Sequence, residues 1–154
     1  MRYDFDKAKA YCFKLFKFRL RTEKEIRDKL KRRQFCKDVI EDVIEYFKSL
    51  NYINDSVFAK NWIESRIQKP FGLKRITYEL REKGISERII EEEISKIKDS
   101  YSEYDTIKRI AEERFRKITQ RIDPEKAKRR IYSFLLRKGF PSDIALDIIN
   151  KFLR

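Results

Sequence analysis

The chain has 154 residues, enough for one ordinary domain or for a short array of small modules. Its 39 Lys and Arg residues against 26 Asp and Glu residues leave a net charge of +13, which favours polyanionic partners such as nucleic acid or a nucleoprotein. Because the chain has no histidine and only three scattered glycines, it lacks the residues for Ser-His-Asp hydrolysis, a His-ligated zinc site, imidazole base catalysis or a phosphate-cradling loop.

Apolar residues recur at helical spacing along almost the whole chain, and one helical pattern occurs three times. Each copy has a leading helix, a middle helix with Ile and Leu four positions apart, a large apolar residue five positions after the Leu, and a last helix. In chain order these landmark residues are Ile26, Leu30 and Phe35, then Ile76, Leu80 and Ile85, then Ile131, Leu135 and Phe140. The pattern predicts an all-α fold of three tandem three-helix, helix-turn-helix-like repeats in an elongated array, over residues 1–50, 51–100 and 101–154.

The residues at the expected helix ends agree with this pattern. Gly84 and Gly139 follow the second and third middle helices, where a left-handed residue is needed, and Gln34 occupies the same place in the first copy. Asp123 followed by Pro124 is typical of an N-cap with a proline at the first helical position. The periodic apolar stripes themselves are assigned to the core, with no chemical role.

The two cysteines and the single tryptophan receive no chemical role either. Cys12 and Cys36 lack the spacing of a metal or redox motif, and we expect two reduced, buried thiols in a cytosolic protein. Trp62 falls on an apolar stripe, so we expect it to anchor the core rather than to stack on a base. The N-terminus lacks a signal-peptide pattern, and no stretch approaches the roughly 18 apolar residues of a membrane helix. We therefore expect a soluble, cytoplasmic protein with no membrane partner and no metal or other cofactor.

The excess positive charge is concentrated on the middle helices. Residues 22–34 hold six basic and three acidic residues, residues 72–83 hold four and two, and residues 124–138 hold six and one. The last helices of the first two copies are acidic, and we expect their Glu runs, such as residues 91–93, to be solvated. Because an acidic last helix would repel phosphate, sequence-specific operator binding through that helix is disfavoured.

Three segments share their order and spacing with a known family. In chain order they are Glu23–Leu30, then Asn54–Ala59 leading to Trp62, Arg66 and Glu79–Ile85, and finally Phe134–Phe140. On three three-helix repeats of this length, they resemble the RecX family of RecA recombinase regulators across nearly the whole chain. The chain departs from the family pattern at Gln34, at Asn54 and Asp55, and at Pro141. None of these departures alters a candidate catalytic group.

The resemblance implies a curved, all-helical modulator that lies in the groove of the RecA filament on single-stranded DNA. It implies inhibition of ATP hydrolysis, strand exchange and coprotease activity, in DNA repair and SOS regulation, without catalysis by the chain itself. It also implies some direct binding to single-stranded DNA, with duplex DNA left open, and we expect the chain to act as a monomer. A DNA-binding transcription regulator built from helix-turn-helix-like units remains an alternative, as does a helical scaffold for an unrelated acidic protein.

We predict that basic residues on or beside the middle helices bind DNA or the filament. The strongest candidate is the basic cluster within residues 126–130, at the N-terminus of a helix. The helix dipole disfavours positive charge there, so the dipole does not explain the cluster and contact with an anion does. The alternative for any single residue is that it complements a helix C-terminus or keeps a face solvated. The candidates are Lys31, Arg32, Arg33, Arg66, Lys74, Arg75, Arg81, Lys83, Lys126, Lys128, Arg129, Arg130, Arg137 and Lys138.

Overall fold

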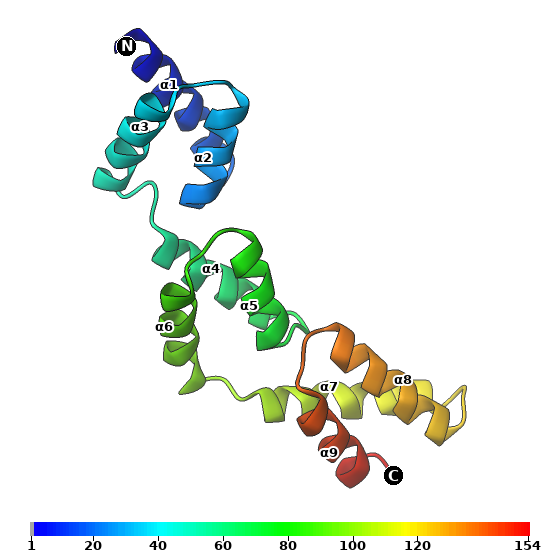
Figure 1. Cartoon of the computed structure of the whole chain (residues 1–154). Helices are drawn as coiled ribbons and strands as arrows, with labels where there is room; N and C mark the ends of the chain where they lie inside the picture. Colours follow the sequence, from blue (N-terminus) through cyan, green and yellow to red (C-terminus); the bar gives the residue numbers. More distant parts are fainter. Residues whose placement is uncertain (1) are drawn as a thin grey trace. The chain divides into compact units, whose positions relative to one another are not determined.

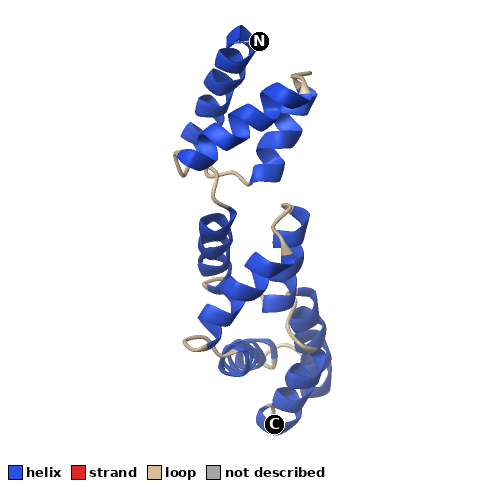
Figure 2. Ribbon diagram, turned by 60° about the vertical axis from the view of Figure 1, so that its left-hand side comes forward, coloured by secondary structure: helices blue, strands red, loops and turns tan. Residues whose placement is uncertain are grey.

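The structure, a computed structural model, describes residues 2–154, which form nine α-helices and no strand (Figure 1 and Figure 2). The prediction of an all-α fold is therefore confirmed for this part of the chain. In chain order the helices are α1 (Arg2–Phe18), α2 (Glu23–Arg32), α3 (Lys37–Ser49), α4 (Asp55–Ile67), α5 (Leu73–Glu82), α6 (Glu87–Lys98), α7 (Glu103–Ile118), α8 (Pro124–Arg137) and α9 (Ser142–Phe152).

Contacts among these helices divide the chain into two compact units. One unit comprises residues 2–61 and 80–90, and the other comprises residues 62–79 and 91–154. The first three helices lie wholly in the first unit, and the last three lie wholly in the second. The helices of the second repeat, α4 to α6, each contribute residues to both units.

The core of the first unit is built from the apolar stripes of α1, α2 and α3. Its buried residues are Ala8, Cys12, Ile26, Leu30, Val39, Ile40, Val43, Ile44, Phe47 and Ile53. Partly buried rings pack against them, as where Phe13 and Phe16 lie with ring centroids 5.0 and 5.1 Å from that of Phe47. Aromatic pairs of this kind add about 1 kcal/mol each beyond the burial of their apolar surface.

The core of the second unit repeats the arrangement with α7, α8 and α9. Its buried residues are Ile107, Ile110, Ala111, Ile131, Leu135, Phe140, Ala145, Ile148, Ile149 and Leu153. Ile131 and Leu135 on α8 are fully buried, like Ile26 and Leu30 at the aligned positions of α2. The Ile and Leu spacing therefore marks the buried face of a middle helix in both units.

The ends of the middle helices also follow the sequence pattern. Gly84 and Gly139 adopt left-handed φ angles of 84° and 88°, and Gln34 adopts a φ of 65° at the aligned place. A left-handed conformation costs a non-glycine residue about 1 kcal/mol or more, so the first repeat carries a local strain that the others avoid. Asp123 caps α8, and Pro124 is its first residue, as predicted.

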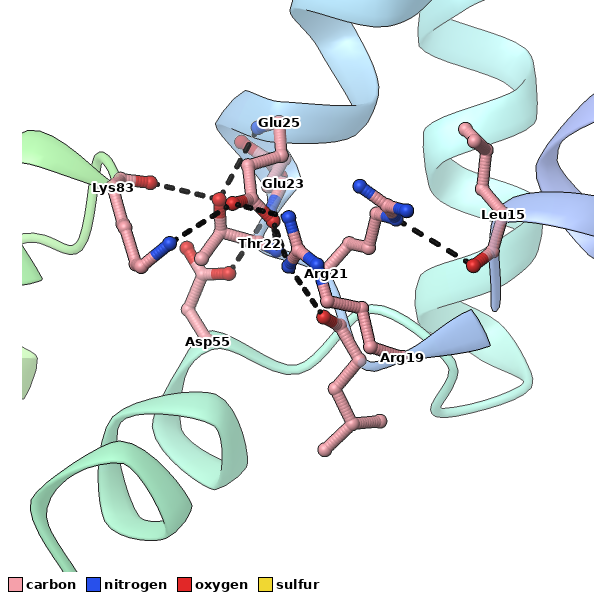
Figure 3. Close-up of polar contacts among 9 residues, drawn as sticks. Leu15, Arg19, Arg21, Thr22, Glu23, Glu25, Asp55 and Lys83 are labelled. Carbon is pink, nitrogen blue, oxygen red and sulfur yellow. Dashed lines mark hydrogen bonds and ion pairs between the residues drawn. The ribbon is translucent and has the colours of Figure 1, made fainter. Parts of the chain in front are cut away.

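In the first unit, a junction at Thr22 ties the start of α2 to the end of α5 and the start of α4 (Figure 3). The buried Thr22 hydroxyl donates to the carbonyl of Lys83, at 2.7 Å, and accepts from the backbone N–H of Glu25, at 3.2 Å. The Lys83 ammonium lies 3.4 Å from the Glu25 carboxylate, and the backbone N–H of Glu23 donates to Asp55 at 3.0 Å. Polar groups of the first repeat thus form hydrogen bonds and an ion pair with polar groups of the second repeat.

The pKa values of the two carboxylates at this junction, Asp55 and Glu25, shift in opposite directions. Burial raises the pKa of Asp55 above its usual value, although the hydrogen bond from Glu23 opposes the rise. Burial also acts to raise the pKa of Glu25, but hydrogen bonds from Arg19 and Thr22, with the Arg19 and Lys83 charges, outweigh it. The pKa of Glu25 therefore falls below its usual value.

The second unit has an equivalent junction at Gly72, which aligns with Thr22. The backbone N–H of Gly72 donates to the carbonyl of Lys138 at 2.7 Å, and the N–H of Leu73 donates to the Glu103 carboxylate at 3.2 Å. A Cβ added to Gly72 would lie 2.2 Å from a backbone carbonyl oxygen, so the close approach requires glycine. Successive repeats therefore use the same aligned positions for their junctions, with different side chains.

Two expectations from the sequence are wrong in detail. Cys36 is exposed rather than buried, because it is the N-cap residue of α3 and precedes the buried stripe, whereas Cys12 is fully buried as expected. Glu93 is not solvated, because its side chain lies on the buried side of α6 and is 7% exposed, with its carboxylate paired to Lys96 at 2.9 Å. Glu91 and its neighbour at 92 are exposed, as expected.

Candidate nucleic-acid interface

The basic residues predicted at the end of the first middle helix lie on the surface. Lys31, Arg32 and Arg33 are exposed at the C-terminus of α2, where positive charge complements the helix dipole. The Arg33 guanidinium lies over the ring of Tyr11, 4.3 Å from its centre. Within residues 2–154 no carboxylate pairs with these three side chains. Their charge is available to an external anion, although the dipole alone also explains their place.

The basic residues of the second middle helix are largely neutralised within the chain. Arg81 forms an ion pair with Glu87, and Lys83 lies 3.4 Å from the carboxylate of Glu25. Lys74 is exposed near the start of α5. Paired cations attract an external phosphate less strongly, because the partner carboxylate repels it. The end of α5 is therefore a weaker candidate for binding a phosphate than its number of basic residues indicates.

Arg66 and Arg75 share a single carboxylate, that of Glu79 on α5. The two guanidiniums donate to it from Nε at 2.9 and 3.3 Å, and the indole N–H of the half-buried Trp62 donates to it at 2.8 Å. The same guanidiniums lie 4.8 and 4.4 Å from the ring centre of Phe71. Trp62 therefore positions Glu79 between two arginines, and this cluster keeps one uncompensated positive charge.

Cations and aromatic rings continue from this cluster onto α8. The Lys138 ammonium lies 4.9 Å from the ring centre of Phe71 and 5.5 Å from that of Phe134. The guanidinium of Arg114, on α7, lies over the same Phe134 ring, 3.5 Å from its centre. Interleaved cations and rings are typical of surfaces that bind single-stranded nucleic acid.

A hollow lined by arginines lies between α7 and α8, with a volume of about 460 Å³. Four of its eight lining residues are arginines and none is acidic. No carboxylate pairs with these arginines in the part of the chain that the structure describes. We call this surface the arginine hollow, and its lining residues are Arg114, Ile118, Arg129, Arg130, Ile131, Ser133, Phe134 and Arg137.

Alignment of the repeats explains why Arg114 lacks a carboxylate partner. Arg66 and Arg114 occupy aligned positions on the leading helices, and Glu79 and Phe134 occupy aligned positions on the middle helices. In the second repeat Glu79 neutralises Arg66. In the third repeat the guanidinium of Arg114 lies over the ring of Phe134, which does not compensate its charge. The arginine of the leading helix is therefore paired with a carboxylate in one repeat and lies over an aromatic ring in the next.

The other predicted residues of α8 lie outside the arginine hollow. Lys126 is exposed in the first turn, and the Lys128 ammonium lies 3.3 Å from the carboxylate of Glu125. Lys128 and Arg129 also line a second hollow, of about 380 Å³, between α8 and α9, together with Tyr132. The predicted cluster at residues 126–130 is thus split, with two of its four cations in the arginine hollow.

The structure brings three predicted residues together and adds one that the sequence analysis missed. Arg129, Arg130 and Arg137 meet in the arginine hollow, where Arg114 joins them from α7. The sequence carried a signal for Arg114, because an arginine stands where the first repeat has the apolar Leu15 on the same stripe. A cation on an apolar stripe needs a partner, and its partner is an aromatic ring in place of a carboxylate.

This surface provides hydrogen-bond donors and positive charge, which suit the oxygens of phosphate or carboxylate groups. Across residues 2–154, no three Cys, Asp or Glu side chains gather where they could hold a metal ion. Over the same residues, no helix combines the length and the apolar character needed to cross a membrane.

Comparison with known proteins identifies all three repeats. Models of the RecX family match residues 8–47 as the first three-helix domain, residues 54–93 as the second and residues 101–150 as the third. The predictions of tandem three-helix repeats and of a resemblance to this family are therefore confirmed.

Individual relatives agree. A regulatory protein RecX from Clostridium perfringens is 33% identical over 149 residues, which are 96% of this chain and 69% of the relative. A protein of the same name from a Mycobacterium species, strain KMS, is 31% identical over 94% of this chain and 81% of its own length. The crystal structure of RecX from Lactobacillus salivarius matches with a TM-score of 0.83 at 26% identity, covering 98% of this chain and 97% of that one. The chain therefore belongs to the RecX family of regulatory proteins.

Proposed function

We propose that this protein binds the RecA filament on single-stranded DNA and inhibits its ATP hydrolysis, strand exchange and coprotease activity. It acts in the cytoplasm as a monomer, in the control of DNA repair and the SOS response, and catalyses no reaction itself. The observation that carries this proposal is the match of all three tandem domains to the RecX family. The relatives are named regulatory proteins, a name that points away from an enzyme.

The distribution of charge supports a nucleoprotein partner. The net charge of +13 attracts polyanions, and the arginine hollow holds four cations that no carboxylate of the described residues neutralises. A filament of protein on DNA offers phosphates and acidic side chains, and both attract such a surface. Long-range attraction speeds association, and the paired donors of a guanidinium hold an oxyanion in a fixed orientation.

Inhibition follows if one chain contacts neighbouring RecA protomers through different domains. The three domains carry different charges, since the end of α5 is paired internally while α8 keeps exposed cations. A ligand that bridges two protomers favours the arrangement of protomers in which both contacts are made. ATP hydrolysis that requires a change in this arrangement then becomes slower.

The test is the rate of ATP hydrolysis by preformed RecA filaments on single-stranded DNA as this protein is titrated in. Binding to the same bare DNA is measured alongside. Inhibition below the concentration that coats bare DNA supports filament recognition, whereas inhibition only at coating concentrations contradicts it and indicates competition for DNA. No inhibition, with a preference of about 10³-fold or more for one duplex sequence, would instead identify a transcription regulator. No nucleic-acid affinity and no effect on RecA would identify a scaffold.

A charge-reversal variant tests the part played by α8. Replacing the four cations of the predicted cluster with Glu should abolish filament inhibition, because repulsion replaces attraction at the surface that meets the polyanion. Their exposed or half-buried side chains lie outside the core, so helicity and melting temperature should stay nearly unchanged. The substitutions are Lys126→Glu, Lys128→Glu, Arg129→Glu and Arg130→Glu.

The matched control reverses four exposed lysines outside the candidate set. It has the same net charge as the test variant, and it should keep most of the inhibition. An equal loss of inhibition in the two variants would show that only net charge matters and would remove α8 from the proposal. The control substitutions are Lys14→Glu, Lys17→Glu, Lys37→Glu and Lys60→Glu.

A further inference from the structure

The arginine hollow presents its cations from one face of α8 and from α7. Arg130, Ser133 and Arg137 are spaced by three and four positions, so their side chains share one face of the helix. Arg129 reaches the same hollow from the neighbouring row, and Arg114 completes it from α7. Two helices of the third domain therefore place four arginines around one hollow.

Several arginines elsewhere in the chain pair with carboxylates of the chain. Arg27 pairs with Glu41, Arg66 with Glu79 and Arg81 with Glu87. The four arginines of the hollow do not, within residues 2–154. Like charges that share a hollow repel one another, so an arrangement without a carboxylate is stabilised by an anion from outside. Guanidinium groups bind phosphate by paired hydrogen bonds, which makes phosphate a suitable anion.

Arg114 differs from the other three because it rests on an aromatic ring. At 3.5 Å from the ring centre, its guanidinium is in van der Waals contact with Phe134, which restricts its orientation. Arg114 is also exposed and lines the hollow, so its side chain is accessible to a ligand. A guanidinium plane held in this way is a surface on which an unpaired base can stack.

We propose that the arginine hollow holds one nucleotide of a single strand, with its phosphate on Arg129, Arg130 and Arg137 and its base on Arg114. This inference rests on the proposed function and locates its DNA contact. A volume of about 460 Å³ lies in the range of pockets that hold small ligands. Bases of a duplex are stacked on one another and are not free to lie on Arg114, so the hollow favours a single strand over a duplex.

The first experiment measures the binding of the full chain to a fluorescent single-stranded oligonucleotide and to a duplex of the same length, by anisotropy. Arg114→Lys keeps the positive charge but removes the planar group. It should weaken single-strand binding about tenfold and leave duplex binding unchanged, because stacking on a base is lost while phosphate attraction remains. Arg116→Lys is the matched control, since Arg116 is exposed on the same helix and does not line the hollow. It should change neither affinity.

The second experiment measures the same single-strand binding over a range of salt concentrations. Replacing Arg129 and Arg130 with Gln should reduce the slope of log K against log salt by about 0.7, since the hollow holds one phosphate and each phosphate contact on a single strand contributes about 0.7. The control replaces Arg116 and Lys117, two exposed cations outside the hollow, with Gln. Its slope should stay close to that of the unaltered chain.

Three results would overturn the assignment. One is equal loss of single-strand and duplex binding in Arg114→Lys, which would refute the base contact. Another is an equal salt slope for the hollow variant and its control, which would refute the phosphate contact. A third is displacement of the oligonucleotide by ATP at comparable nucleotide concentration, which would make the hollow a site for free nucleotides.

The ATPase assay on RecA filaments separates this inference from the proposed function. If the unaltered chain inhibits filaments while the hollow variants bind DNA normally, the inference fails and the proposed function stands. If the hollow variants lose single-strand binding as expected but the unaltered chain does not inhibit filaments, the proposed function fails and the DNA site stands.

Discussion

Replacing Gly139 with alanine should destabilise the second unit more than any equivalent change in the first. Its φ of 88° alone costs alanine about 1 kcal/mol. The added methyl would lie 2.3 Å from Cβ and 2.6 Å from the backbone nitrogen of Arg75, so the first turn of α5 must move. That movement also strains the 2.7 Å hydrogen bond from Gly72 to Lys138, worth about 1 kcal/mol. We expect a total loss of about 2–4 kcal/mol in the free energy of unfolding.

The aligned positions provide two matched comparisons. Gly84→Ala has the same left-handed strain, at a φ of 84°, but its methyl would meet the side chain of Lys24, at 2.5 Å, which can move aside. We expect a smaller loss of about 1–2 kcal/mol. Gln34→Gly relieves the strain at a φ of 65° and should stabilise the chain by up to about 1 kcal/mol.

The assay is urea unfolding followed by far-ultraviolet circular dichroism, with the midpoint and the slope m fitted for each variant. A change in midpoint at constant m reports a change in stability. Two results would contradict this prediction: a stability of Gly139→Ala within about 0.5 kcal/mol of the unaltered chain, or a larger loss of stability in Gly84→Ala than in Gly139→Ala.

Three further predictions concern single side chains. Because folding lowers the pKa of Glu25, the ionised carboxylate stabilises the fold fully above the unfolded pKa of 4.5, and this stabilisation is lost as the pH falls through the folded pKa. Glu25→Gln should therefore lower the free energy of unfolding in urea by about 1 kcal/mol at pH 7 and by little in acid. A loss of stability that does not depend on pH would contradict this. A thiol reagent followed by mass spectrometry should label the exposed Cys36 in the folded chain, and Cys12, whose pKa burial raises to about 12, only on unfolding; early labelling of both would be evidence against the buried site. Glu79→Ala leaves the indole N–H of Trp62 without its acceptor, so the fluorescence of this single tryptophan should shift and the stability should fall by about 1–3 kcal/mol, whereas an unchanged spectrum would argue against the hydrogen bond.

The fold could be predicted from the sequence because its determinants are local and periodic. Ile131 and Leu135 lie four positions apart on a buried face, and the same spacing recurs in every repeat. Gly139 marks a left-handed helix end that is readable from the residue type alone. Cys36 was misplaced because one residue at a helix start can turn outward without altering the periodicity around it.

The candidate site was only partly predictable, because charge counts do not show which cations are paired. Arg81 and Arg137 occupy nearby places in their repeats, but the first is paired with Glu87 and the second lines an open hollow. The difference depends on which side chain each neighbouring helix presents in space. Arg114 was overlooked because its partner, Phe134, lies on another helix and carries no charge.

Recognition of the RecA filament by this chain can be tested with two affinities measured at one salt concentration. One is the affinity of the chain for preformed RecA filaments on single-stranded DNA, and the other is its affinity for the same DNA without RecA. We expect tighter binding to the filament, because DNA phosphates and protein surface are recognised together, and we expect this advantage to be lost when the cations within residues 126–130 are reversed in charge. Equal or weaker binding to the filament would contradict it.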